Sequence, residues 1–170
     1  MALKETVILF CFSLLTLSAS SQSQRYAEDS INAQQLIANK LKHLETVGVV
    51  NYLYLFSDAG TIVILYEVDG KIKGTKCYYK GKLGSDFRNL RLTKEDKVNY
   101  GKCIEMAKMD TTINFSNCKN FVHSFNRITF SANTSKHYIK GIFTSDCTDM
   151  LDRKGMYQLH SIYKHLLGFK

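Results

Sequence analysis

Two histidines, His123 and His137, have side chains and positions that could support catalysis. An imidazole exchanges protons near neutral pH, and two of them can act as acid and base on a phosphate ester. We expect them on neighbouring segments, where nearby lysines could hold the phosphate. Those lysines are Lys119, Lys136 and Lys140. No ribonuclease motif accompanies this pattern, so a small secreted hydrolase acting on a polyanion is kept as the alternative to a non-enzymatic function.

A second group of residues could bind a polyanion without catalysis. Between positions 71 and 82, lysines interleave with tyrosines, so that positive charge and flat rings occur together. Such a surface can bind nucleic acid or another polyanion by charge and stacking. The same lysines would also protect an exposed strand edge from pairing with another chain, and both interpretations stay open. The candidate binding residues are Lys76, Tyr78, Lys80 and Lys82.

The cysteines predict disulfides rather than a metal site. Cys11 lies in a predicted signal peptide, and four cysteines follow it, which in an exported chain favours two bridges. Three pairings are possible, and we favour Cys103–Cys118, which closes a short loop, with Cys77–Cys147, which connects the early and late parts of the fold. A bridge that closes a loop of about 15 residues contributes about 3 kcal/mol to stability. Without C-x-x-C or C-x-x-H spacing, neither a metal nor a cofactor is expected.

Two N-x-S/T sequons begin at Asn114 and Asn133. Both would be glycosylation sites if the chain enters a eukaryotic secretory pathway. Asn133 falls at the tip of a predicted hairpin, where a glycan would be accessible.

The first 21 residues have the features of a secretory signal peptide. Lys4 supplies a positive charge, Val7–Leu17 form an apolar run of 11 residues, and small residues follow at 18–21. This run is too short to cross a bilayer core, which needs about 20 residues, and the small residues suit cleavage. We expect a flexible lead-in over 22–27, no transmembrane segment after cleavage, and a secreted or periplasmic location.

The composition is that of a globular protein. Of the 170 residues, 45% are hydrophobic and 22% are charged, which excludes wholesale disorder and allows a single domain, placed at 28–170. The absence of proline excludes a proline-stiffened linker. The net charge is +8, which favours an acidic macromolecule or polyanion as partner, although a basic surface without a specific partner is the simpler explanation.

The first half of the predicted domain contains a helix and a three-strand meander. Apolar residues at three- and four-residue spacing predict a helix over 28–46, which Gly48 ends. Two strands with apolar residues on both faces follow, and a third, half-charged strand should lie near an edge. Asp69-Gly70 is typical of a type I′ hairpin turn. The predicted strands are 49–57, 61–68 and 71–80.

The second half contains a hairpin between two helices. Thr93 to Asp96 resembles a capping box with Asp in place of Glu, so a helix should run to about position 108. The hairpin should pair 125–132 with 136–144, and an amphipathic helix is predicted over 149–167. The residues expected to face inward from the first of these helices are Val98, Ile104 and Ala107.

Together these elements predict an α+β fold, in which an antiparallel sheet, the meander plus the second hairpin, packs with N-terminal and C-terminal helices. The helix followed by a meander resembles cystatin-like proteins in architecture only, and no cystatin motif is present, so protease inhibition is not implied. Because no catalytic constellation stands out, we expect a small exported, disulfide-stabilised domain with a non-enzymatic binding role or an envelope or matrix role.

Overall fold

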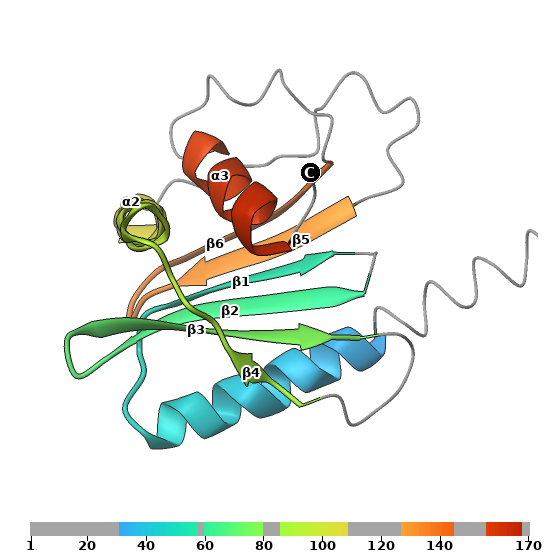
Figure 1. Ribbon diagram of the computed structural model, residues 1–170. Helices are drawn as coiled ribbons and strands as arrows, with labels where there is room; N and C mark the ends of the chain where they lie inside the picture. Colours follow the sequence, from blue (N-terminus) through green and yellow to red (C-terminus); the bar gives the residue numbers. More distant parts are fainter. Residues whose placement is uncertain (1–30, 58–59, 80–85, 109–126, 145–155, 168–170) are drawn as a thin grey trace, which may run out of the picture.

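The computed structural model describes residues 31–57, 60–79, 86–108, 127–144 and 156–167. Its centre is an antiparallel six-stranded sheet with the strand order β4-β3-β2-β1-β5-β6. A helix over 31–46 lies on one face, and two helices, α2 (Lys94–Lys108) and α3 (Met156–Leu167), lie on the other (Figure 1). The predicted α+β fold is confirmed.

The N-terminal helix, 31–46, packs through the stripe that its spacing predicts. Ala33, Ile37 and Leu44 are buried. The helix ends where Gly48 takes a positive φ of 81°, and the N–H of Val49 donates to the carbonyl of Leu44 at 3.1 Å. A glycine in this conformation is a common way to end a helix, because it has no side chain to clash.

The meander consists of β1 (Tyr52–Ser57), β2 (Thr61–Val68) and β3 (Lys71–Tyr78). Asp69 and Gly70 both have positive φ, at 52° and 67°, as a type I′ turn requires. The first six residues of β2 are buried, in agreement with a strand that is covered on both faces. β3 lies near the edge, as predicted.

A two-residue strand, β4 (Arg88–Asn89), lies outside β3 and was not predicted. The N–H of Leu90 donates to the carbonyl of Gly74 at 2.8 Å. A Cβ atom at Gly74 would lie 2.8 Å from Leu65 and 3.0 Å from Leu92. The missing side chain at Gly74 therefore lets the segment around Leu90 pack closely against the sheet.

The second hairpin joins β5 (Arg127–Asn133) to β6 (Tyr138–Thr144), and β5 pairs with β1. β5 continues one residue past its predicted end, and β6 begins two residues later than predicted, because the turn takes up residues 134–137. Positions 125 and 126, predicted to begin the first strand, lie outside the described residues. In this turn the hydroxyl of Thr134 accepts a hydrogen bond from the N–H of His137 at 3.0 Å. Ile128, Phe130 and Ala132 are fully buried, so alternate residues of β5 face the layer of α2 and α3.

The predicted capping box of α2 is confirmed. The carboxylate of Asp96 accepts hydrogen bonds from the backbone N–H and hydroxyl of Thr93 at 2.8 and 2.7 Å, and the Thr93 hydroxyl accepts from the Asp96 N–H at 3.1 Å. Ile104 and Ala107 are buried as predicted, but the prediction for Val98 was wrong, since it is 48% exposed. The buried stripe passes through Asp96 and Tyr100 instead, because Asp96 turns inward to cap the helix.

α3 completes the layer that α2 begins. Leu159, Ile162 and Tyr163 are buried on its predicted apolar face. The residues over 149–155, where we predicted its first turns, lie outside the described residues. No helix in the described part of the chain is long and apolar enough to span a bilayer.

Candidate functional site

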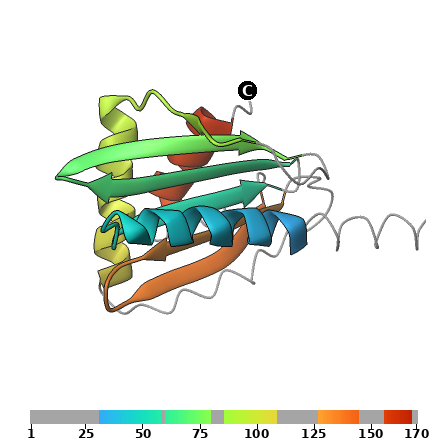
Figure 2. The same ribbon diagram turned by 90° about the horizontal axis from the view of Figure 1, so that it is seen from below.

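The N-terminal helix covers only part of its face of the sheet. It packs on β1, β2 and β3 through a core that includes Phe56, Ile62 and Ile64. β5 and β6 lie beside the helix on the same side of the molecule (Figure 2). The space between the helix and these strands is a groove of about 790 Å³, which is within the usual range of small-molecule sites.

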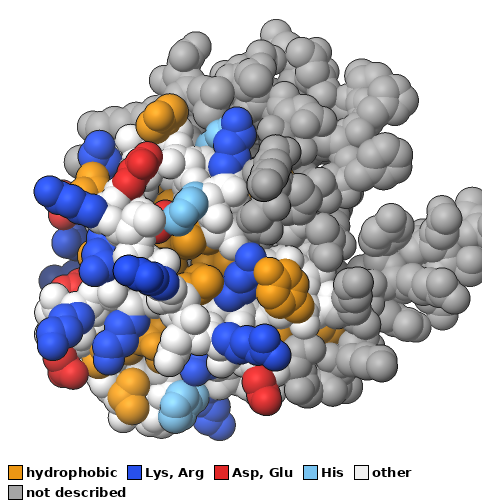
Figure 3. Space-filling view, viewed as in Figure 1, with side chains coloured by type: hydrophobic (Ala, Val, Ile, Leu, Met, Phe, Trp, Pro, Cys, Tyr) orange, Lys and Arg blue, Asp and Glu red, His pale blue; other side chains and the backbone are white. Residues whose placement is uncertain are grey.

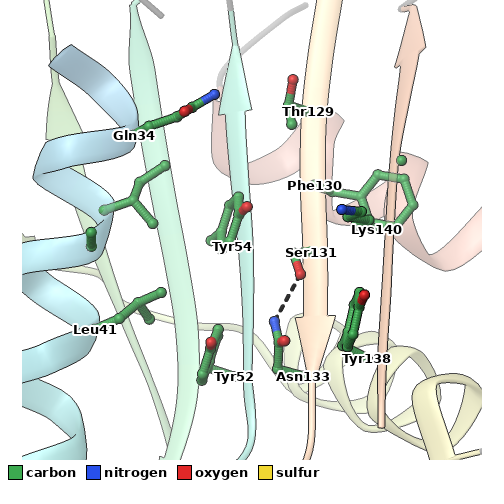
Figure 4. A pocket seen from close by; sticks show the side chains of 13 residues that line it. Gln34, Leu41, Tyr52, Tyr54, Thr129, Phe130, Ser131, Asn133, Tyr138 and Lys140 are labelled. Atoms are coloured by element: carbon green, nitrogen blue, oxygen red, sulfur yellow. Dashed lines mark hydrogen bonds between the residues drawn. The ribbon is translucent and has the colours of Figure 1, made fainter. Parts of the chain in front are cut away.

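The floor of the groove is made of two rows of side chains that cross three strands. In the first row Tyr54 of β1 pairs with Ser131 of β5, which pairs with Lys140 of β6. In the second row Tyr52 pairs with Asn133, and Asn133 pairs with Tyr138. Because side chains of alternate residues share one face of a strand, both rows point to the same side. Figure 4 shows the two tyrosines of β1 between the helix and β5.

The wall of the groove is the flank of the N-terminal helix nearest to β5. Ile37, Ala38 and Leu41 give it an apolar surface, and Gln34 lies at one end, on the side of Thr129 (Figure 4). The groove thus combines an apolar wall with a floor rich in hydroxyl and amide groups.

The electrostatics of the groove are simple. Lys140 is the single charged side chain among the described residues that line it, and its Nζ lies 5.8 Å from the centre of the Tyr138 ring. Burial raises the pKa of Tyr54, with a hydrogen bond to Ser131 acting the other way. Burial also raises the pKa of Tyr52, and the charge of Glu45 adds to that effect. Both phenols are therefore neutral hydrogen-bonding groups at physiological pH.

Asn133 lies in the groove and not at the tip of the hairpin. It is the last residue of β5, and its Nδ2 donates to the hydroxyl oxygen of Ser131 at 2.8 Å (Figure 4). A glycan on Nδ2 would disturb this hydrogen bond and fill the groove. The other predicted sequon, at Asn114, lies outside the described residues.

Only one member of the predicted histidine pair lies in the described part of the chain. His137 lies in the turn between β5 and β6, whereas His123 lies outside the described residues. Lys136, expected to assist them, is exposed in the same turn, while Lys140 lies in the groove. Lys119 is outside the described residues.

The described lysines of the predicted basic strand do not all share one face. Lys73 and Lys76 lie on opposite faces of β3, because they are three positions apart and successive side chains of a strand alternate between faces. Lys76 donates a hydrogen bond to the carbonyl of Leu166 at 2.6 Å, and its Nζ lies 4.8 Å from the centre of the exposed Tyr78 ring. Its ammonium group thus stabilises the C-terminal end of α3.

On the face seen in Figure 3, positive side chains are scattered among acidic and apolar ones. The remaining two predicted binding residues, Lys80 and Lys82, lie outside the described residues.

Cys77 and Cys103 are both buried, but they belong to different layers. Cys77 packs under the N-terminal helix and Cys103 in the core of α2 and α3, so the two cannot pair with each other. No disulfide occurs between cysteines of the described ranges, and the predicted partners, Cys118 and Cys147, lie outside them. Burial raises the pKa of a Cys103 thiol to about 12, so such a thiol would be no nucleophile at neutral pH.

A second polar cluster joins the start of α2 to the exposed side of α3. The Nδ1 atom of His165 lies 2.8 Å from the carboxylate of Asp96. The hydroxyl of Ser161 accepts from Asn99 at 3.1 Å and donates to Glu95 at 3.3 Å. A serine, a histidine and an aspartate thus come near one another, but Ser161 is bound to Glu95 and Asn99, and Asp96 caps a helix. The cluster therefore attaches one helix to the other.

Within the described ranges, no group of histidine, cysteine and acidic side chains could hold a metal ion. No family model, no curated protein and no solved structure matches this chain. The groove must therefore be interpreted from its own chemistry.

Sequence reasoning missed the residues that form the groove, apart from Lys140 and Asn133, which it singled out for other roles. One signal was present in the second hairpin, where Thr129, Ser131 and Asn133 alternate with buried apolar residues. It indicated a polar face, but it could not tell that β5 would lie beside β1 and its tyrosines.

Proposed function

We propose that this protein is an exported, non-enzymatic binding domain whose ligand occupies the groove between the N-terminal helix and strands β1, β5 and β6. The observation that carries the proposal is the groove itself, with its volume of about 790 Å³, an apolar wall and two polar rows on the floor. Pockets of this size with an apolar lining and a few convergent polar groups are typical small-molecule sites.

The chemistry of the groove favours binding over catalysis. Among the described residues that line it are one lysine and three tyrosines, but no carboxylate, histidine or cysteine. General acid–base catalysis at neutral pH needs a group whose pKa is near the working pH. Burial raises the pKa of Tyr52 and of Tyr54 further above neutral pH, so neither phenol is suited to exchange protons at that pH.

The function is tested by filling the groove. Ala38→Phe would place a ring in the space beside the wall, whereas Asn39→Phe adds the same ring at the next, exposed helix position, which does not line the groove. A panel of small molecules should contain compounds that raise the melting temperature of the wild type and of Asn39→Phe but not of Ala38→Phe. A ligand present at 100 times its Kd stabilises a protein by about 2.7 kcal/mol, which a thermal shift detects.

A ligand that stabilises Ala38→Phe as well as the wild type would contradict binding in the groove. Circular dichroism of both variants would show whether the added ring leaves the fold intact. The Asn39→Phe variant controls for the helix propensity of an added phenylalanine and for nonspecific hydrophobic binding to its ring.

Export and disulfide formation are part of the proposal. They are supported by the apolar run of 11 residues near the N-terminus and by the four cysteines that follow it. The exported chain should have lost about 20 residues in an intact-mass measurement, and thiol labelling of the denatured, unreduced protein should give no adduct. Recovery of a full-length chain, or labelling of two or more cysteines, would contradict these expectations.

A further inference from the structure

We propose that the groove binds a small amphipathic carboxylate, with its head group at Lys140 and its apolar body along the wall of the N-terminal helix. This inference rests on the proposed function and names the class of ligand. It is carried by the position of one positive charge in a groove whose other described lining residues are uncharged.

The charge of Lys140 defines where an anion would bind. Lys140 is exposed on β6, in the same cross-strand row as Ser131 and Tyr54. Neighbouring strands lie about 4.8 Å apart, so this row presents an ammonium and two hydroxyl groups across about 10 Å. The two oxygens of a carboxylate can accept from an ammonium and a neighbouring hydroxyl at once.

Ser131 is held in position to contribute to this site. Ser131 is only 6% exposed, and its hydroxyl oxygen accepts a hydrogen bond from Asn133 Nδ2 at 2.8 Å. That bond and the hydrogen bond with Tyr54 fix the Ser131 hydroxyl within the row, beside the position of the ammonium group. The second row is a poorer place for an anion, because the charge of Glu45 acts on Tyr52 there.

The rest of the groove suits an apolar body. Ile37, Ala38 and Leu41 form a wall without charge. From the row of Ser131, either end of the floor lies two residue steps or about 7 Å away, and the crossing from β6 to β1 adds about 10 Å, which together accommodate a medium-length alkyl chain. Burial of such a chain against the wall would supply most of the affinity, since the hydrophobic contribution increases with the apolar area removed from water.

Other classes of small ligand fit this arrangement less well. A polyanion needs several cations, and the described lining of the groove has one. A cationic ligand would meet Lys140 without a carboxylate among these lining residues to compensate. A neutral sugar would leave the ammonium without a charged partner and would cover the apolar wall with hydroxyl groups.

The test compares three probes that share one chain: decanoate, decanol and decylammonium, each kept below its micelle concentration. Isothermal titration calorimetry should show the tightest binding for decanoate, with decanol weaker by about tenfold or more, because hydrogen bonds to charged groups are the stronger ones. Lys140→Gln should weaken the binding of decanoate by a similar factor and leave the affinity for decanol unchanged. Lys136→Gln, which removes the same charge from the exposed turn nearby, should change neither.

Equal affinities for decanoate and decanol would overturn the carboxylate assignment, as would equal losses in Lys140→Gln and Lys136→Gln or the binding of none of the three probes. The Ala38→Phe variant separates this failure from that of the proposed function. If Ala38→Phe abolishes the binding of decanol and the wild type shows no preference for decanoate, the groove is still the binding site. Only the assignment of a carboxylate ligand is then wrong. If Ala38→Phe leaves decanoate binding intact, the carboxylate is not bound in the groove and the assignment also falls.

Discussion

The two faces of the sheet are built from the same strands, but they are covered to different extents. On the face of α2 and α3, buried side chains continue from β2 through β1 and β5 to Ile139 of β6. On the opposite face, the core under the N-terminal helix involves β1, β2 and β3, and the floor beyond them is polar. The closed face stabilises the domain, and the half-covered face leaves room for a ligand.

β5 shows how one strand contributes to both faces. Ile128, Phe130 and Ala132 are fully buried against the layer of α2 and α3, while Thr129, Ser131 and Asn133 line the groove. Successive side chains of a strand point to opposite faces. The residues that hold β5 in place and the residues that it presents to a ligand can therefore be substituted separately.

The largest effect is expected from removing a side chain of the closed face. Leu159→Ala should lower the free energy of unfolding by about 3 kcal/mol, because Leu159 is fully buried and its loss leaves a cavity. Leu41→Ala on the wall of the groove should cost about 1 kcal/mol, since Leu41 is only partly buried. Urea denaturation of the two variants measures both values. Equal losses would show that the two faces do not differ as described.

A smaller effect is expected at the junction between α2 and α3. Asp96→Ala removes the acceptor for the backbone N–H of Thr93 and the partner of His165, so stability should fall by about 2 kcal/mol. Asp86→Ala, at an exposed position, should stay within about 0.5 kcal/mol of the wild type. Thermal or urea denaturation of Asp96→Ala and Asp86→Ala measures both changes in stability. Because Asp96 lies on the closed face, ligand binding in the groove should be unaffected.

The smallest effect concerns the lysines of β3. Lys76→Gln should cost up to about 1 kcal/mol, because it removes the ammonium group from the C-terminal end of α3. Lys73→Gln makes the same change on the other face and should cost less than about 0.5 kcal/mol. Heparin binding by the two variants across a salt series should be equal and weak. A selective and strongly salt-dependent loss in Lys76→Gln would restore this strand as a polyanion site.

Much of the local structure follows from the sequence alone. The alternation in β5, the stripe of the N-terminal helix and the positive φ values at Asp69-Gly70 are properties of short segments, so residue type and spacing determine them. The Thr93–Asp96 capping box is local in the same sense. These features were predicted, and the structure confirms them.

The order of the strands and the groove were decided only by the tertiary structure. That β5 pairs with β1 places Tyr52 and Tyr54 beside Ser131 and Asn133, although more than seventy residues separate them in the chain. Lys76 likewise meets the end of α3 through a contact between residues 90 positions apart. Periodicity specifies which face of an element is apolar but not which element will cover it, because pairing and packing depend on the whole set of surfaces that must be buried together.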